Sequence, residues 1–242
     1  MSIRIKHGSW QRLLPVIHNN SIDLVYTDPP YGMNYTSGIP GHRNWNKSGE
    51  SNSKFDKVID GDDPTSHGSM DWQIFWNHCY RVLKDDRYLI THGNFSFLAT
   101  QYPMILKAGF TEKGVLSWRK QFAVGGDLEG SAKRDWEQIL YVAKGKPKTN
   151  PINTLRGLRK RVSESEDWVF QLKKKERQGH PTQKPVALGR QLVAWACPPN
   201  GVVLDPFCGS GTSMLAAKFE KRDGIGFEVY EAFYKIAKNR CL

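Results

Sequence analysis

Apolar positions recur with two different spacings along the chain, and each spacing predicts a different kind of element. Short apolar runs bounded by turn-forming residues predict buried strands, whereas apolar residues three and four positions apart predict the buried face of a helix. Strands are expected at Ile3–Lys6, Ile22–Thr27, Tyr88–Thr91, Phe110–Trp118, Gln138–Ala143, Val202–Leu204 and Gly224–Phe227. Helices are expected at Trp10–Ile17 (with Ser9 as its N-cap), Asp71–Leu83, Phe95–Ala108, Pro185–Ala196, Thr212–Glu220 and Tyr230–Asn239. This alternation of strands and helices is typical of an α/β sheet protein.

Three stretches show neither the strand spacing nor the helix spacing of apolar residues. Residues 32–66 are rich in Gly, Ser, Asn and Lys, and a run of that length in a compact domain predicts a mobile flap. Residues 119–134 and 145–179 are also expected to be irregular. The 242 residues are predicted to form a single domain that carries the 32–66 flap and an inserted region at 145–179.

The charge balance indicates the kind of partner. Lys and Arg number 35 against 24 Asp and Glu, which gives a net charge of +11 and favours a polyanion, with nucleic acid first. Within 145–179 the basic residues are interleaved with Trp168 and Phe170, a mixture that favours contact with a nucleic acid over a merely solvated surface. The residues predicted to bind the nucleic acid, which the family resemblance described below identifies as DNA, are Arg156, Arg159, Lys160, Arg161, Lys173, Lys174 and Lys175.

The compartment and metal content are predicted from what the chain lacks. Its first residues have no apolar signal-peptide core, and no apolar run reaches membrane-spanning length, so we expect a cytoplasmic protein without a membrane partner. Cys79, Cys197, Cys208 and Cys241 are scattered without metal-ligand spacing. Neither disulfides nor a metal site is therefore predicted.

The segment Asp28-Pro29-Pro30-Tyr31 follows the predicted strand Ile22–Thr27. Its prolines remove two N–H donors, so the loop offers a carboxylate and carbonyl acceptors with few competing donors. Such a loop suits a ligand held by its own N–H groups, such as an amine, and the tyrosine ring could stack on a flat substrate. The alternative is a structural proline turn.

A glycine-rich turn joins a second strand to a helix, in the segment Val202 to Thr212. Glycines at a helix start let the backbone approach a ligand closely. A Walker P-loop requires Lys where Thr212 stands, and a dinucleotide fingerprint requires a small residue where Met214 stands. The remaining interpretation is a nucleoside cofactor with a carboxylate but no phosphates. Glu228, after the next strand, stands where a carboxylate could bind ribose hydroxyls.

Three motifs occur in one order: Asp28-Pro29-Pro30-Tyr31, then His180-Pro181-Thr182-Gln183-Lys184-Pro185, then Asp205-Pro206-Phe207-Cys208-Gly209-Ser210-Gly211-Thr212. Together they resemble the S-adenosylmethionine-dependent DNA amino-methyltransferases, in the permuted class often called beta. The resemblance runs from the first strand to the last helix and leaves only the 32–66 flap and the inserted region 145–179 unmatched. It implies that residues 1–242 form one catalytic domain and that 145–179 is its target-recognition region. It implies a doubly wound, seven-stranded, mostly parallel α/β sheet of Rossmann-like, circularly permuted topology.

The permuted order makes specific predictions about neighbours. Strand Ile3–Lys6 should lie beside Gly224–Phe227, which brings the termini together. Strands Leu24–Thr27 and Val202–Leu204 should be neighbours at the switch point, where open α/β sheets bind ligands. Asp28 and Asp205 should then share one edge of the sheet.

The resemblance also implies roles for residues. Asp28, Pro29, Pro30 and Tyr31 would be catalytic, accepting the hydrogens of the target amine and stacking on the flipped base. S-adenosyl-L-methionine would be the cofactor, and its predicted binding residues are Ser9, Asp28, Thr182, Lys184, Asp205, Phe207, Cys208, Gly209, Ser210, Gly211, Thr212 and Glu228. Lys184 could instead meet a DNA phosphate. Ser9 stands where the family often has an acid.

The expected reaction is methylation of adenine N6 in double-stranded DNA, as in restriction–modification systems. An acid at the head of the Pro-Pro-Tyr loop is commoner in adenine enzymes, but cytosine N4 and a non-catalytic DNA-binding protein remain alternatives. Cys208 lacks the Pro-Cys pairing of cytosine ring-carbon enzymes and is interpreted as a packing residue. His180 is expected to anchor its loop rather than act as a base. The oligomeric state stays open, with a homodimer as one possibility.

Overall fold

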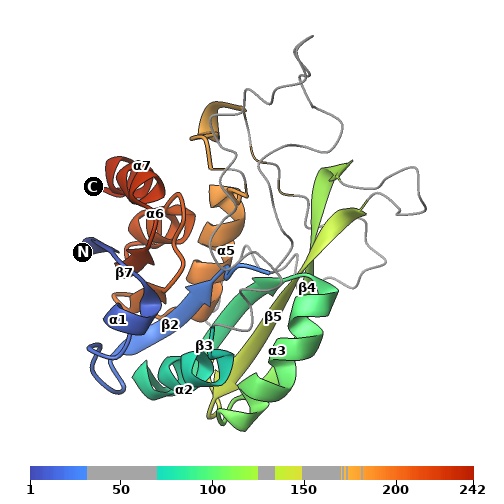
Figure 1. Cartoon of the computed structure of the whole chain (residues 1–242), viewed down its shortest axis with the longest axis vertical. Coiled ribbons are helices and arrows are strands. Elements are labelled where there is room, and N and C mark those ends of the chain that lie inside the picture. The colour runs from blue at the N-terminus through green and yellow to red at the C-terminus, as the bar shows by residue number, and fades with distance from the viewer. Residues whose placement is uncertain (32–69, 125–133, 149–169, 171, 173, 181) are drawn as a thin grey trace. The chain divides into compact units, whose positions relative to one another are not determined.

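One seven-stranded sheet runs through the part of the chain described by the computed structural model, which comprises residues 1–31, 70–124, 134–148, 170, 172, 174–180 and 182–242 (Figure 1). Its strand order is β1-β7-β6-β2-β3-β5-β4. The strands are β1 (Ile3–His7), β2 (Ile22–Thr27), β3 (Leu83–Gly93), β4 (Thr111–Val124), β5 (Arg134–Lys144), β6 (Val202–Asp205) and β7 (Asp223–Glu228). The predicted α/β class with a seven-stranded sheet is confirmed.

The strand pairings explain the topology. The pairs β1–β7, β7–β6, β6–β2 and β2–β3 are parallel, while β3–β5 is antiparallel. Ile3 lies opposite Gly224 in the β1–β7 pair, and Leu24 lies opposite Val203 in the β2–β6 pair. Both neighbour relations expected from the permuted order are therefore confirmed. The two termini lie close together as well (Figure 1).

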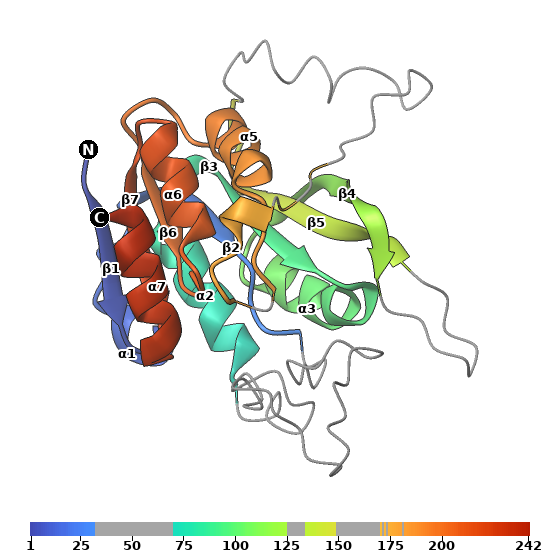
Figure 2. The ribbon, with the colours of Figure 1, turned by 90° about the horizontal axis from the view of Figure 1, so that it is seen from above.

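Helices cover both faces of the sheet. Seen from above, α5, α6 and α7 lie on one face and α1, α2 and α3 on the other (Figure 2). Their bounds are α1 Trp10–Leu13, α2 Trp72–Val82, α3 Phe95–Lys107, α5 Val186–Ala196, α6 Thr212–Phe219 and α7 Glu231–Cys241, with a short 3-10 helix, η3, at Lys174–Glu176. None of the helices described is long and apolar enough to cross a membrane.

Helix α2 shows why the apolar spacing predicts helices here. Its buried residues, three and four positions apart, are Trp72, Phe75, Trp76, Cys79 and Val82. They form one face that packs against the sheet and α3, where the Trp76 indole N–H donates to Gln101 Oε1 at 2.8 Å. Burying rings of this size contributes strongly to stability.

Some boundaries differ from the predictions. Helix α1 ends at Leu13 instead of Ile17, because Pro15 has no N–H to continue it. Ser9 does occupy the N-cap position, but its side chain makes no cap hydrogen bond. The prediction that 119–134 is irregular is wrong at both ends, since β4 continues to Val124 and β5 begins at Arg134. Polar cross-strand pairs such as Arg119–Asp135, at 3.0 Å, support strands that an apolar pattern does not indicate.

The chain divides into two compact units. The first comprises Met1–Pro29, Trp72–Phe122 and Asp135–Leu242, and the second comprises Pro30–Asp71 and Ala123–Arg134. The predicted 32–66 flap lies outside the described residues, as does most of the predicted recognition region 145–179. The single-domain organisation with these two insertions stays a prediction.

Candidate active site

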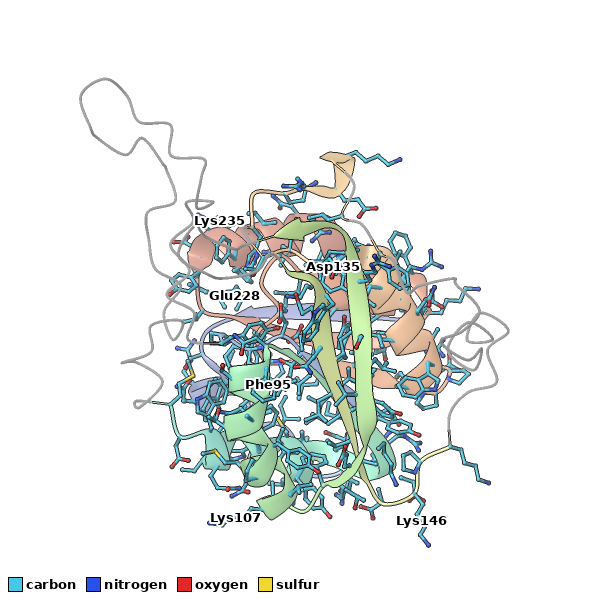
Figure 3. All side chains as sticks on the ribbon, turned by 90° about the vertical axis from the view of Figure 1, so that its right-hand side faces the viewer. Phe95, Lys107, Asp135, Lys146, Glu228 and Lys235 are labelled. Carbon is cyan, nitrogen blue, oxygen red and sulfur yellow. The ribbon has the colours of Figure 1, made fainter. Side chains whose placement is uncertain are left out.

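The carboxyl ends of two neighbouring strands place two acids at one edge of the sheet. Strand β2 ends at Thr27 and β6 at Asp205, and the two strands pair in parallel with Val25 opposite Leu204. Asp28 and Asp205 therefore leave the sheet at the same edge, as expected. Glu228 at the end of β7 and Asp135 at the start of β5 lie toward this end, whereas Lys107 and Lys146 lie at the other (Figure 3). Ligands bind at such an edge in open α/β sheets.

Asp28 is held by an ammonium group. Its Oδ2 lies 2.7 Å from Lys184 Nζ, and the side chains are 24% and 10% exposed, respectively. Pro29 beside it is buried. Pro30 and Tyr31 begin the second unit, so their catalytic roles stay predictions. Asp28 is thus a positioned and partly accessible hydrogen-bond acceptor.

Lys184 bridges Asp28 to a second carboxylate that the sequence analysis does not identify. Lys184 Nζ lies 3.0 Å from Glu137 Oε1, and Lys120 Nζ lies 3.1 Å from Glu137 Oε2. Burial alone would lower the pKa of Lys184, but Asp28 and then Glu137 raise it above its usual value. Lys184 is therefore charged, and its predicted cofactor or DNA contact stays a prediction.

Glu137 also binds a buried histidine. His92 Nδ1 lies 3.1 Å from Glu137 Oε1, and His92 Nε2 lies 3.1 Å from the Tyr26 hydroxyl. Burial opposes ionisation of Glu137, but Lys184 first and His92 next hold its pKa well below the ordinary value. Burial, followed by the charges of Asp28 and Asp205, raises the pKa of Tyr26, so its hydroxyl keeps its proton.

The atoms of Asp28, His92 and Glu137 also have the spacing of metal ligands. Among the described residues, these three offer ligand atoms within 4.8 Å of one another. The Lys184 ammonium contacts both carboxylates, at 2.7 and 3.0 Å. With Lys120, which lies 3.1 Å from Glu137, the chain itself supplies two positive charges for these two carboxylates, and we interpret the cluster as an ion-pair network.

Asp205 has different surroundings. Its Oδ1 accepts the Phe207 backbone N–H at 3.0 Å, and its Oδ2 accepts the Ser213 hydroxyl. The residue is 4% exposed, and burial raises its pKa to about 7. Asp205 thereby ties strand β6 to the first turn of α6 and shapes the glycine loop between them.

The glycine loop requires its glycines at two positions. Gly209 and Gly211 have φ angles of +51° and +80°, in the left-handed region. A Cβ on Gly211 would lie 2.9 Å from Cys241 Sγ, and one on Gly209 would lie 2.9 Å from His180 Nε2. Gly211 is also the N-cap of α6, so the loop directs the first backbone N–H groups of that helix outward from the sheet edge.

Glu228 completes this side of the site. Its two carboxylate oxygens accept the backbone N–H groups of Gly209 at 2.9 Å and Tyr230 at 2.8 Å. Burial raises its pKa in spite of these hydrogen bonds. Gly8, next to Ser9, donates its N–H to the Glu228 carbonyl at 2.8 Å, which brings the predicted Ser9 position to the same strand end.

Other predicted cofactor residues support the loop by packing and hydrogen bonds. The Phe207 ring lies 5.3 Å from that of Phe75. Cys208 is buried, and burial raises the pKa of its thiol, in agreement with a packing residue. The Thr212 hydroxyl donates to the Lys184 carbonyl at 3.2 Å, which joins two of the three motifs, and Arg240 donates to the Ser210 carbonyl at 2.6 Å.

His180 has the environment of an anchoring residue. Its ring centre lies 4.2 Å from that of Phe233, and its Nδ1 accepts the Thr182 backbone N–H at 3.3 Å. Burial lowers the pKa of His180 to about 4. The ring is therefore neutral at pH 7, lies over Gly209 and fixes the loop that contains Thr182.

The predicted DNA-binding residues are barely described. Arg156, Arg159, Lys160, Arg161 and Lys173 lie outside the described residues, and only the backbone of Lys174 is described. Lys175 is exposed in η3. Contact of these residues with DNA stays a prediction.

Comparison with known proteins bears on this arrangement. Residues 22–239 match the N6/N4 DNA methylase family. The chain belongs to this family. Type II methyltransferase M.HpaI from Haemophilus parainfluenzae is 26% identical over 246 residues, which cover 95% of this chain and 71% of that protein. The match makes the chain a DNA methyltransferase of the N6/N4 type, without distinguishing adenine from cytosine.

Solved structures share the fold of this DNA methylase. The crystal structure of the M1.HpyAVI-SAM complex matches with a TM-score of 0.71 at 21% identity and covers 98% of each chain. PvuII DNA methyltransferase, which is cytosine-N4-specific, matches with a TM-score of 0.70 at 18% identity over 100% of this chain and 87% of its own. The sheet order and helix layers described above are therefore those of methyltransferases.

Proposed function

We propose that this DNA methylase transfers a methyl group from S-adenosylmethionine to the exocyclic N6 amine of adenine in double-stranded DNA. The observation that carries the proposal is Asp28, held 2.7 Å from the Lys184 ammonium at the sheet edge that also bears the glycine loop. A homodimer stays a prediction.

The residues of the glycine loop suit such a cofactor. Gly211 is the N-cap of α6, so the first backbone N–H groups of that helix lie at the sheet edge, where they would favour a carboxylate. Asp205 offers a negative charge for the ammonium of the methionine part. Glu228 at the end of β7 has lone pairs beyond its two backbone contacts and would accept ribose hydroxyls. Bound S-adenosylmethionine supplies an activated methyl group, so the chain needs no covalent intermediate.

Asp28 would act on the target amine. The lone pair of an exocyclic amine is delocalised into the ring, and hydrogen bonds from its N–H groups to the Asp28 carboxylate and the Pro29 carbonyl would direct that lone pair toward the methyl group. The same carboxylate would stabilise the positive charge that develops on nitrogen. The target base must leave the duplex to reach this loop, at a cost of a few kcal/mol that DNA contacts offset.

The choice of adenine rests on Asp28 itself. An acid at this position is the family's tendency for adenine, whereas Ser there suggests cytosine N4. Cytosine N4 is therefore the competing outcome of the test and not a second proposal.

The test is to incubate the protein with methyl-labelled S-adenosylmethionine and unmethylated DNA, RNA or protein in parallel, then digest and separate the products. We expect label in N6-methyladenine from DNA. Label in 4-methylcytosine alone would overturn the adenine assignment. Absence of label from every acceptor, with cofactor and DNA binding intact, would favour a non-catalytic DNA-binding protein.

A further inference from the structure

A line of polar contacts runs from the interior of the sheet to the Asp28 loop. It passes from the Tyr26 hydroxyl to His92 Nε2 at 3.1 Å, and from His92 Nδ1 to Glu137 Oε1 at 3.1 Å. It continues from Glu137 Oε1 to Lys184 Nζ at 3.0 Å, and from Lys184 Nζ to Asp28 Oδ2 at 2.7 Å. All five residues belong to the first compact unit.

The inner part of this line is fixed by the sheet. Strands β3 and β5 pair with His92 opposite Ile139 and Gly93 opposite Gln138, so the backbones that bear His92 and Glu137 are joined by a ladder. His92 is fully buried. Tyr26 and Glu137 contact the two ring nitrogens of His92 at 3.1 Å each, so the ring is held between them. Glu137 is consequently held in one orientation.

The outer part is an ion-pair network with balanced charges. Asp28 and Glu137 carry two negative charges, and Lys184 and Lys120 carry two positive charges. Because Glu137 shares the Lys184 ammonium, it moderates the attraction of that ammonium for Asp28. Without the charge of Glu137, the Lys184 ammonium would pair with Asp28 alone, and Asp28 would then be a weaker acceptor for a developing positive charge.

We propose that Glu137, oriented by His92, is a positioning residue that fixes Lys184 and, through Lys184, the carboxylate that grips the target amine. This role rests on the proposed function of Asp28. Glu137 acts on Asp28 indirectly, through its 3.0 Å contact with Lys184.

The first test is Glu137→Gln, which keeps the shape and removes the charge. We expect the single-turnover methyl-transfer rate to fall about 10- to 100-fold while the Kd for S-adenosylmethionine changes less than threefold, because a small displacement of a catalytic group costs rate. A rate within twofold of wild type would overturn the proposal. Glu137→Asp should recover part of the rate, because it restores the charge.

A matched control separates positioning from stability. Asp23 is another buried carboxylate, which lies at the opposite end of β2 and contacts Lys84 at 2.8 Å and Arg87 at 3.1 Å. Asp23→Asn should lower the melting temperature at least as much as Glu137→Gln but leave the transfer rate, measured well below both melting temperatures, within twofold of wild type. An equal loss of rate in both variants would count against a positioning role.

A double-mutant cycle tests the route through Asp28. In an Asp28→Asn background, Glu137→Gln should lower the residual single-turnover rate less than threefold, because the group that it positions has lost its charge. An equal loss of rate in both backgrounds would overturn the proposed connection from Glu137 through Lys184 to Asp28.

A second cycle needs no activity. The melting-temperature losses of Glu137→Gln and Lys184→Met should be clearly less than additive in the double variant, because each breaks the same buried pair. Additive losses would overturn the proposed connection from Glu137 through Lys184 to Asp28, even if methyl transfer is normal. A wild-type protein without any methyl transfer would instead count against the proposed function.

Discussion

The Asp28 loop and the glycine loop that follows Asp205 have similar sequences at their start, but their aspartates have different surroundings. Each follows a buried parallel strand and begins with an aspartate near a proline, and the strands are neighbours. Asp28 is 24% exposed and pairs with an ammonium group at 2.7 Å. Asp205 is 4% exposed and accepts hydrogen bonds from a hydroxyl and a backbone N–H, and burial raises its pKa to about 7.

Asp28 and Asp205 have equivalent positions at the ends of neighbouring strands, so their different properties come from the groups that surround each carboxylate. The Lys184 ammonium holds Asp28 in place as a partly accessible hydrogen-bond acceptor, which suits direct contact with a substrate amine. Buried hydrogen bonds make Asp205 part of the glycine loop, which suits shaping a cofactor site. Two carboxylates in contrasting environments commonly divide the labour of an active site in this way.

The largest expected effect is a loss of turnover when Asp28, but not Asp205, is the acid whose charge is removed. Asp28→Asn keeps the shape of the loop but removes the charge that would stabilise the developing positive nitrogen, so we expect kcat to fall at least about 10²- to 10³-fold. Rates at saturating cofactor, measured with labelled methyl groups, check this. A kcat within tenfold of wild type would remove Asp28 from its assigned role.

A backbone change should affect the other loop selectively. Gly211→Ala places a Cβ 2.9 Å from Cys241 Sγ at a φ of +80°, so we expect cofactor affinity to fall about 10-fold or more and the melting temperature to drop by several degrees. Gly189→Ala is the matched control, because Gly189 lies within α5 and is buried there. Calorimetric titration showing unchanged affinity for Gly211→Ala would contradict the assigned loop function.

The pKa of Asp205 predicts how cofactor affinity depends on pH. Below about pH 7 Asp205 holds a proton, and a cationic ligand group would have to displace it. Affinity for S-adenosylmethionine should therefore rise as pH increases from 6 to 8, by up to about tenfold per unit below 7, and level off above. His180, with a pKa of about 4, stays neutral in this range. Asp205→Asn should flatten the profile, and an equally steep profile in that variant would assign the dependence to another group.

The smallest expected effect concerns a support of the glycine loop from the last helix. Arg240 donates to the Ser210 carbonyl at 2.6 Å and to the Ser210 hydroxyl at 3.0 Å. Arg240→Met should weaken cofactor binding about threefold to tenfold with little change in kcat at saturating cofactor, because it loosens only one loop. A larger loss in kcat than in cofactor affinity would mean that the glycine loop and the Asp28 loop do not have separate roles in binding and transfer.

The sequence was sufficient to predict the elements with a clear apolar pattern and the three motifs. In buried strands such as β2 and amphipathic helices such as α2, the spacing of apolar residues predicts which residues are buried. The permuted order then placed β1 beside β7 and β2 beside β6 correctly.

The sequence could not predict the partners of Asp28. Glu137 and Lys120 lie in strands β5 and β4, within segments whose polar residues give no apolar alternation. His92 and Tyr26 look like ordinary residues of buried strands. Their contacts depend on the antiparallel β3–β5 register, which is a long-range property that no local pattern encodes. An acid in the middle of a strand, such as Glu137, is the one local signal that could have indicated a buried ion pair.

The division of labour between the two acids is tested most directly by titrating S-adenosylmethionine into Asp28→Asn by calorimetry. We expect a Kd within about threefold of wild type in this variant, with methyl transfer almost absent, and a much weaker Kd in Asp205→Asn at pH 8. If Asp28→Asn lost cofactor affinity as severely as Asp205→Asn, the two loops would share one binding role, and Asp28 would not act on the target amine alone.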